Sequence, residues 1–155
     1  MRQFRYYIET SVWNFLLEED RPERREITER FFHQVEGLGV ITISDVVTRE
    51  VARAPQAKRE ALERLFQRHN PVLLEEVPEV LVLADRYITE GLIPAKYVND
   101  ALHVAVAVVH EQDVVVSWNF EHLVKLKTRF GVNGLNRLLG YREIEIVSPE
   151  EVSIE

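Results

Sequence analysis

Apolar and polar residues along this chain alternate between short β-type runs and longer helical patterns. The runs over residues 40–43 and 114–117 are rich in β-branched side chains, which is typical of buried strands. Between such runs, apolar residues recur at helical spacing, as Ile27, Phe31 and Val35 do. Short strands that alternate with helices predict a mostly parallel sheet covered by helices on both faces.

The predicted elements extend through the whole chain without a repeat or a linker. Strands are predicted over residues 4–8, 40–43, 72–74, 114–117 and 144–147. Helices are predicted over residues 12–17, 22–36, 45–54, 56–69, 78–90, 97–111, 119–130 and 133–139, with Ser11, Ser44 and Asn119 as N-caps. We therefore expect one α/β domain over residues 1–155.

Composition limits the chemistry that this domain can carry. The chain has 155 residues, a net charge of −7 and no cysteine, which excludes a disulfide framework, a thiolate zinc site and a cysteine nucleophile. The acidic balance argues against binding nucleic acid through bulk positive charge, but it is compatible with contact through bound divalent cations. The sequence has neither a secretory signal nor an apolar stretch that could span a bilayer, so we expect a cytoplasmic protein with no membrane contact.

Acidic residues follow several of the predicted strands. Glu9 ends the first strand, Glu50 lies on the second turn of the helix after the second strand, and Asp100 opens the apolar helix that leads into the fourth. Asn119 follows that fourth strand. Because ligands of open parallel sheets gather at the carboxyl ends of the strands, these four side chains are candidates for one site.

Each position also has a simpler interpretation. Asp100 could only complement the helix dipole, Glu50 could be a solvated surface residue, and Asn119 could be an N-cap. Thr10 and Ser11 are candidate caps whose hydroxyls could also orient Glu9. As a set, three clustered carboxylates repel one another unless protons or cations are present, and a site with only oxygen ligands favours Mg²⁺ or Mn²⁺.

His103 lies one helical turn after Asp100, so Asp-x-x-His is a possible ligand pair. The sequence offers no third histidine or cysteine close by that would complete a zinc site. We therefore favour a hydrogen-bonded, semi-buried histidine over a zinc ligand at this position.

Four segments together resemble a PIN domain, close to the VapC-like toxins and related PIN nucleases. The most specific segment is NDALHVAVAVVHEQDVVVSWNFEHL; the others are YYIETSVWNFL, ITISDVVTREVAR and GYREIEIVSPEEV, and together they cover nearly the whole chain. The resemblance implies a three-layer α/β/α sandwich with a central, mostly parallel sheet. It also implies cleavage of RNA that depends on Mg²⁺ or Mn²⁺.

By this resemblance, Glu9, Glu50 and Asp100 are the metal-binding acids, and Asn119 takes the place of a fourth catalytic acid. Two positions depart from the family's pattern, because the first acid is usually Asp and the fourth is normally an Asp rather than a neutral amide. The supporting positions are Thr10, Ser11, Ser117 and His103. A toxin of a type II toxin–antitoxin pair is implied, with RNA as substrate, an antitoxin as partner and a homodimer as assembly.

Two other functions compete with this hypothesis. A catalytically weak or inactive PIN-like binding module is favoured by the neutral Asn119. A receiver-like phosphoacceptor domain would need paired acids near the first strand and a late lysine, which Glu9 and Asn119 do not provide. Basic residues that could guide an RNA backbone, unless they only form a solvated face, are Arg2, Arg5, Lys125, Lys127 and Arg129.

Overall fold

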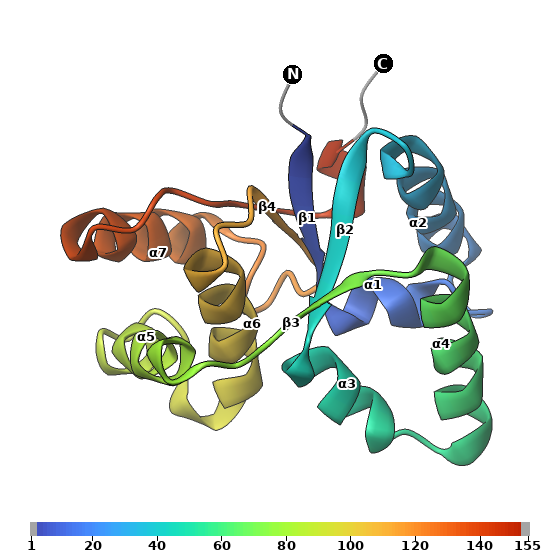
Figure 1. The fold of residues 1–155 in the computed structure, drawn as a ribbon, viewed down its shortest axis with the longest axis horizontal. Coiled ribbons are helices and arrows are strands. Elements are labelled where there is room, and N and C mark those ends of the chain that lie inside the picture. The colour runs from blue at the N-terminus through green and yellow to red at the C-terminus, as the bar shows by residue number, and fades with distance from the viewer. Residues whose placement is uncertain (1–2, 153–155) are drawn as a thin grey trace.

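Five parallel strands form the central sheet of this protein in a computed structural model, which describes residues 3–152 (Figure 1). The strands are β1 (Phe4–Ile8), β2 (Gly39–Ser44), β3 (Val72–Leu74), β4 (Val114–Val116) and β5 (Glu145–Val147). Their order in the sheet is β3-β2-β1-β4-β5, and every neighbouring pair is parallel. The prediction of a mostly parallel sheet is confirmed, and the sheet is in fact parallel throughout the described residues.

Helices cover both faces of this sheet. They are α1 (Thr10–Phe15), α2 (Pro22–Val35), α3 (Asp45–Ala52), α4 (Gln56–His69), α5 (Pro78–Thr89), α6 (Val98–Val109) and α7 (Leu126–Leu139), with short 3-10 helices η1 (Ala95–Tyr97) and η2 (Pro149–Val152). The chain builds outward from β1 to β3 and then returns to the far side of β1 for β4 and β5. Since crossovers between parallel strands are right-handed, this reversal moves the later helices to the opposite face. Figure 1 shows α1 to α4 on one side of the sheet and α5 to α7 on the other, which confirms the three-layer α/β/α fold.

Open α/β sheets form a crevice where the strand order reverses, which in this sheet is at the carboxyl ends of β1 and β4. These two strands are neighbours, with Ile8 in register with Val116, so the residues that follow them enter the same space. Such a switch point is where open α/β sheets bind their ligands. Glu9 and Ser117 are the first residues beyond the two strand ends.

The segment after β4 differs from the prediction. A helix over residues 119–130 is wrong, because residues 119–125 form turns and α7 begins only at Leu126. Leu123 and Val124 turn into the core, and both of their backbone N–H groups donate to the Asn119 carbonyl, at 3.1 and 2.9 Å. The predicted separate helix over 133–139 is instead the second half of α7, which runs through Gly131 without a break.

Trp13 anchors α1 to the sheet. Its side chain is fully buried, and its ring packs against Phe32 and Phe66 at centroid distances of 4.9 and 4.8 Å. The indole N–H donates to the Ile8 carbonyl at 3.2 Å, so α1 is tied to the end of β1 only one residue before Glu9.

Within residues 3–152, the structure contains no helix that is both long and apolar enough to cross a membrane.

Gly39 and Gly134 provide a matched test of this packing. A Cβ on Gly39 would lie 2.6 Å from Tyr6 Cε2 and 2.8 Å from the Phe4 carbonyl oxygen, whereas a Cβ on Gly134 has nothing within 4 Å. We predict that Gly39→Ala lowers the free energy of unfolding by roughly 1–3 kcal/mol, because β1 and β2 must move apart. Gly134→Ala should raise it by about 0.5–1 kcal/mol, since Gly134 lies in an exposed helix interior.

Urea denaturation of both variants, followed by circular dichroism, measures this difference. Equal stability of the Gly39→Ala variant and the parent protein would contradict the close pairing of β1 with β2.

Candidate metal centre

Glu9 is the first residue of the site along the chain, and it joins the end of β1 to the start of α1. Its backbone N–H donates to the Val116 carbonyl at 3.0 Å, which extends the pairing with β4 by one residue. Its side chain is the N-cap of α1, since Oε2 accepts a hydrogen bond from the Ser11 N–H at 3.1 Å. The prediction that Ser11 caps this helix is therefore wrong. Glutamate is an unusual cap, and its longer side chain has to bend back to reach the first turn.

Two serine hydroxyls hold the other oxygen of Glu9. Ser11 Oγ donates to Glu9 Oε1 at 2.6 Å, and Ser117 Oγ donates to the same oxygen at 2.5 Å. Each hydroxyl oxygen also accepts a backbone N–H, from Trp118 and Asn119 respectively, both at 2.9 Å. Because these N–H groups occupy the serine lone pairs, the hydroxyl protons are directed at Glu9. Oε1 is thus fully engaged, and only Oε2 can reach a ligand.

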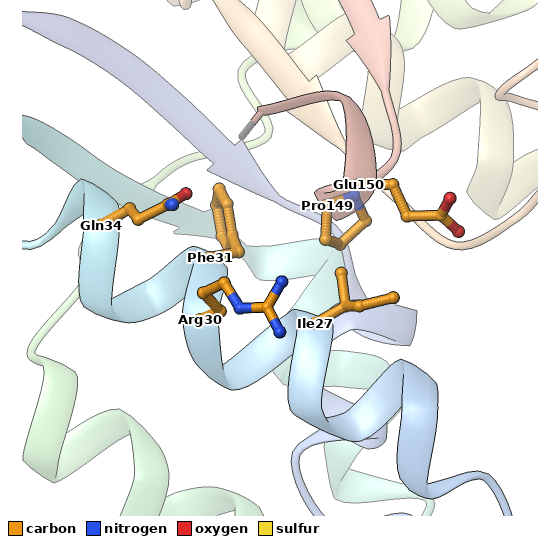
Figure 2. Close-up of a pocket in the computed structure, with 6 residues that line it drawn as sticks. All are labelled: Ile27, Arg30, Phe31, Gln34, Pro149 and Glu150. Atoms are coloured by element: carbon orange, nitrogen blue, oxygen red, sulfur yellow. The ribbon is translucent and has the colours of Figure 1, made fainter. Parts of the chain in front are cut away.

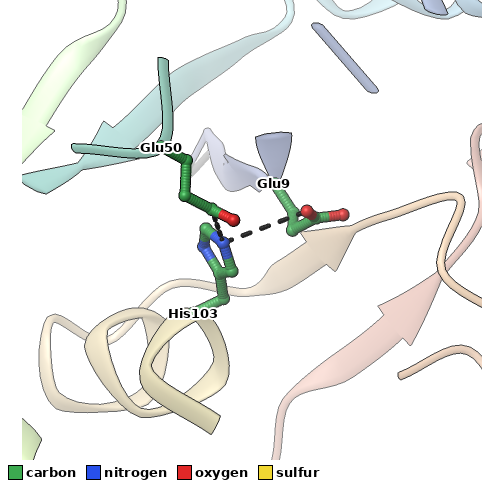
Figure 3. A group of neighbouring side chains, drawn as sticks. All are labelled: Glu9, Glu50 and His103. Carbon is green, nitrogen blue, oxygen red and sulfur yellow. Dashed lines mark hydrogen bonds and ion pairs between the residues drawn. The ribbon is translucent and has the colours of Figure 1, made fainter. Parts of the chain in front are cut away.

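Glu50 faces Glu9 from α3, and His103 reaches both of them from α6 (Figure 3). His103 Nε2 lies 2.6 Å from Glu50 Oε1 and 3.9 Å from Glu9 Oε2. Thr10 Oγ1 also donates to Glu50 Oε1, at 2.8 Å. Glu50 thus resembles Glu9 in having one oxygen held by side chains of the protein; its Oε2 accepts no hydrogen bond within residues 3–152, whereas Glu9 Oε2 accepts only the Ser11 N–H.

His103 is completely buried, and its second nitrogen is also bonded. Nδ1 lies 2.7 Å from the Tyr7 hydroxyl, which in turn lies 2.7 Å from Ser44 Oγ. Burial raises the pKa of Tyr7 well above its ordinary value, so the phenol stays neutral. Because the Tyr7 and Ser44 hydroxyls can both reverse direction, this chain can bond either a neutral or a protonated imidazole.

Charge pairing outweighs burial for the Glu50–His103 pair. Burial alone would raise the pKa of Glu50, but the hydrogen bond and the charge of His103, with help from Thr10, bring it below its usual value. Burial alone would likewise lower the pKa of His103, but the hydrogen bond that it donates to Glu50 and the negative charges of Glu9, Glu50 and Asp100 raise it. The pair is therefore best described as a carboxylate and an imidazolium.

Asp100 lies in the first turn of α6 and is half-buried beside the same group. Burial and then the nearby charge of Glu9 raise its pKa, while His103, His122 and hydrogen bonding by Asn119 act in the opposite direction. The ionisation of Asp100 is therefore coupled electrostatically to the charge of Glu9. Within residues 3–152, the group of possible metal ligands whose ligand atoms all lie within 4.8 Å of one another consists of Glu9, Glu50 and His103.

Asn119 has a different role from that of a fourth acid. Its Oδ1 accepts the His122 backbone N–H at 3.0 Å, so this oxygen closes the turn after β4. With Oδ1 occupied, the amide presents its N–H₂ group to Asp100, in agreement with its lowering of the Asp100 pKa. The predicted helix cap at Asn119 is therefore wrong, because no helix begins there and its side chain closes a turn instead.

The donor set fits a hard divalent cation. Glu9 and Glu50 each have one oxygen that accepts no side-chain hydrogen bond within residues 3–152, and burial and then the negative charge of Glu9 raise the pKa of Asp100, which a nearby cation would counteract. Carboxylate oxygens of this kind suit Mg²⁺ or Mn²⁺. Both nitrogens of His103 already have partners, so this side chain fits the orientation of Glu50 better than the direct binding of a metal.

The structure does not place Arg5 or Arg129, two of the cationic residues expected from the sequence, at the site. Arg5 lies on β1 one residue after its first position, far from the carboxyl end, and Arg129 forms an ion pair with Glu151 at 3.2 Å. Arg2 lies outside the described residues. The structure instead places Arg53 and Lys58 in a cleft that shares Thr10 and Glu50 with the site. In the sequence, only the short separation of Arg53 and Lys58 from Glu50 could have indicated that they lie near the site.

A separate cavity of about 170 Å³ lies between α2 and η2 and shares no residue with the acidic group (Figure 2). It is lined by Ile27, Arg30, Phe31, Gln34, Pro149 and Glu150. Its one basic side chain, Arg30, pairs with Glu26 at 3.4 Å. This cavity therefore offers no convergent set of reactive groups.

Solved structures share this fold at low sequence identity. A crystal structure of VapBC2 from Rickettsia felis bound to a promoter DNA fragment matches with a TM-score of 0.60 and 12% identity, covering 94% of this chain and 98% of the other. VapBC-1 from nontypeable Haemophilus influenzae matches with a TM-score of 0.60 and 13% identity, covering 95% of this chain and 99% of the other. Comparison with curated protein sequences gives no match.

The PIN domain family model matches residues 6–121. This span begins in β1 and ends within the turns that follow β4, so it contains Glu9, Glu50, Asp100 and Asn119. It also covers well over half of the chain, and the fold agrees with it. This protein belongs to the PIN domain family.

Proposed function

We propose that this protein is a Mg²⁺- or Mn²⁺-dependent endoribonuclease that hydrolyses phosphodiester bonds of single-stranded or structured RNA. The observation that carries the proposal is the matched geometry of Glu9 and Glu50. Each carboxylate has one oxygen fixed by side chains of the protein, and its other oxygen, which in Glu9 also accepts the Ser11 N–H, is available to a ligand at the switch point of a PIN domain sheet.

In this proposal, Glu9, Glu50 and Asp100 hold the cation. When bound, the cation polarises the scissile phosphate and activates a water molecule for attack. Ser11 and Ser117 fix the direction of Glu9, and Thr10 and His103 do the same for Glu50.

Asn119 positions Asp100 by donating from its amide group, because its oxygen is occupied by the His122 N–H. We therefore assign Asn119 a positioning role rather than a place among the ligands. This leaves three carboxylates, which suits one cation better than two.

The toxin of a type II toxin–antitoxin pair is the biological setting we propose. The support for it is family membership and the similarity in fold to proteins solved as VapBC structures. An antitoxin partner and a homodimer belong to the same proposal. The competing candidate, a PIN-like binding module without activity, is favoured by the neutral side chain of Asn119.

Cleavage assays distinguish these two candidates. We predict that the purified protein cleaves single-stranded RNA in Mn²⁺ or Mg²⁺ and that a chelator stops it. Asp100→Asn should lower the rate by at least the roughly 10- to 100-fold that disturbing a metal-binding group typically costs. Asp85→Asn, the same substitution at an exposed position of α5, is the matched control and should cleave like the parent protein. Equal cleavage by the parent and Asp100→Asn would refute the nuclease proposal.

The metal-free protein offers a second test, because protonated His103 supplies the positive charge that the cation would supply. The pKa of His103 is raised in the folded state, so its stabilising effect is complete below the unfolded pKa of about 6.5 and is lost as pH rises through the folded pKa. The pKa of Glu50 is lowered in the folded state, so the stability that its carboxylate contributes is lost only in acid, as pH falls through that pKa.

We therefore predict that, relative to His103→Gln, the metal-free parent loses stability as pH rises from about 6.5 through the raised folded pKa of His103. Saturating Mn²⁺ should remove this loss. Urea unfolding at several pH values measures it, and parallel pH profiles for the two metal-free proteins would contradict the charge assignment.

A further inference from the structure

A cleft of about 270 Å³ opens beside Glu50, between α1, α3 and α4. Thr10 and Glu50 belong both to this cleft and to the candidate metal centre. The remaining lining residues are Asn14, Val51, Arg53, Ala54, Pro55, Lys58 and Leu62. A neighbouring hollow shares Asn14 and Lys58 with it, so the groove continues outward between α1 and α4.

The lining combines three kinds of surface. Val51 and Leu62 are buried core residues and give the cleft an apolar floor. Arg53 and Lys58 are exposed cations, and neither forms a salt bridge with any residue in 3–152. Asn14 is partly buried, and its side-chain amide has no hydrogen-bond partner in the same part of the chain.

These unpaired cations differ from their neighbours on the same two helices. Arg49 on α3 pairs with Glu76 at 2.5 Å, and Arg59 on α4 pairs with Glu63 at 4.0 Å. Those two cations are partly neutralised within the protein. Arg53 and Lys58 therefore carry the free positive charge beside Glu50, in a protein whose net charge is −7.

We propose that this cleft binds the nucleotide next to the scissile phosphate of a single-stranded RNA, an inference that rests on the proposed nuclease function. Arg53 and Lys58 bind the backbone phosphate, the base lies on the apolar floor, and the Asn14 amide bonds the edge of the base. An amide with a free donor and a free acceptor can distinguish bases, whereas phosphate contacts only position the strand. Asn14 is thus a specificity-determining residue.

The test measures RNA binding rather than cleavage, in the Asp100→Asn background with Mg²⁺. Fluorescence anisotropy is recorded with short labelled oligonucleotides of A, C or U over a range of salt concentrations. Arg53→Ala combined with Lys58→Ala should weaken binding about 10-fold and reduce the salt slope by about 0.7 for each phosphate that is no longer neutralised, equally for all three oligonucleotides. Arg59→Ala is the matched control and should change neither quantity appreciably.

Asn14→Ala should leave the salt slope unchanged and alter the relative affinities for the three oligonucleotides several-fold. Thermal unfolding of each variant confirms that the substitutions, which lie outside the core, leave the fold intact.

The proposal is overturned if the double variant binds RNA with the same affinity and salt slope as the Arg59→Ala control. That result would assign the cleft to another occupant, such as a polypeptide partner. It would leave the nuclease proposal standing if the parent protein still cleaves RNA. Failure of the parent to cleave RNA would instead count against the proposed function itself.

Discussion

Two serine hydroxyls fix one oxygen of Glu9 where β1 and β4 end, and this clamp sets the direction of the other oxygen. The clamp depends on the parallel register of the two strands, which brings Ser117 opposite Glu9. It also depends on α1 beginning at once, since Ser11 bonds the same carboxylate through both its hydroxyl and its N–H. The extra methylene of glutamate, compared with the aspartate usual in the family, gives the side chain enough length to cap α1 while still facing Glu50.

Electrostatic balance explains why the acids can lie so close together. Glu9, Glu50 and Asp100 would repel one another where these strands end, and the pKa of Asp100 is raised by burial and then by the charge of Glu9. The fully buried His103 offsets it, held in place by the Tyr7 and Ser44 hydroxyls. The same side chain orients Glu50, so the residue that balances the charge also shapes the site. A protein of this kind can keep its acidic crevice folded before any cation arrives.

Sequence patterns predicted the sheet well, because each strand is a short apolar run bounded by clear turn or capping residues. They also predicted which polar residues would follow those strands, since the carboxyl ends of parallel strands meet at one edge. Local patterns could not predict that Glu50 would pair with His103, because this contact joins residues 53 positions apart. The turn at Asn119 was missed for a similar reason, since Leu123 and Val124 enter a core formed by distant segments.

In the proposed site, Glu9, Glu50 and Asp100 share one divalent cation while the serine clamp on Glu9 stays in place. A crystal soaked in Mn²⁺ tests it directly through the anomalous density of the metal. We expect one peak, bounded by these three carboxylates, with Ser11 and Ser117 still bonded to Glu9 and with Asn119 not among the ligands. A peak bound by His103 without Asp100, a second peak at Asn119, or no peak in the crevice would contradict it.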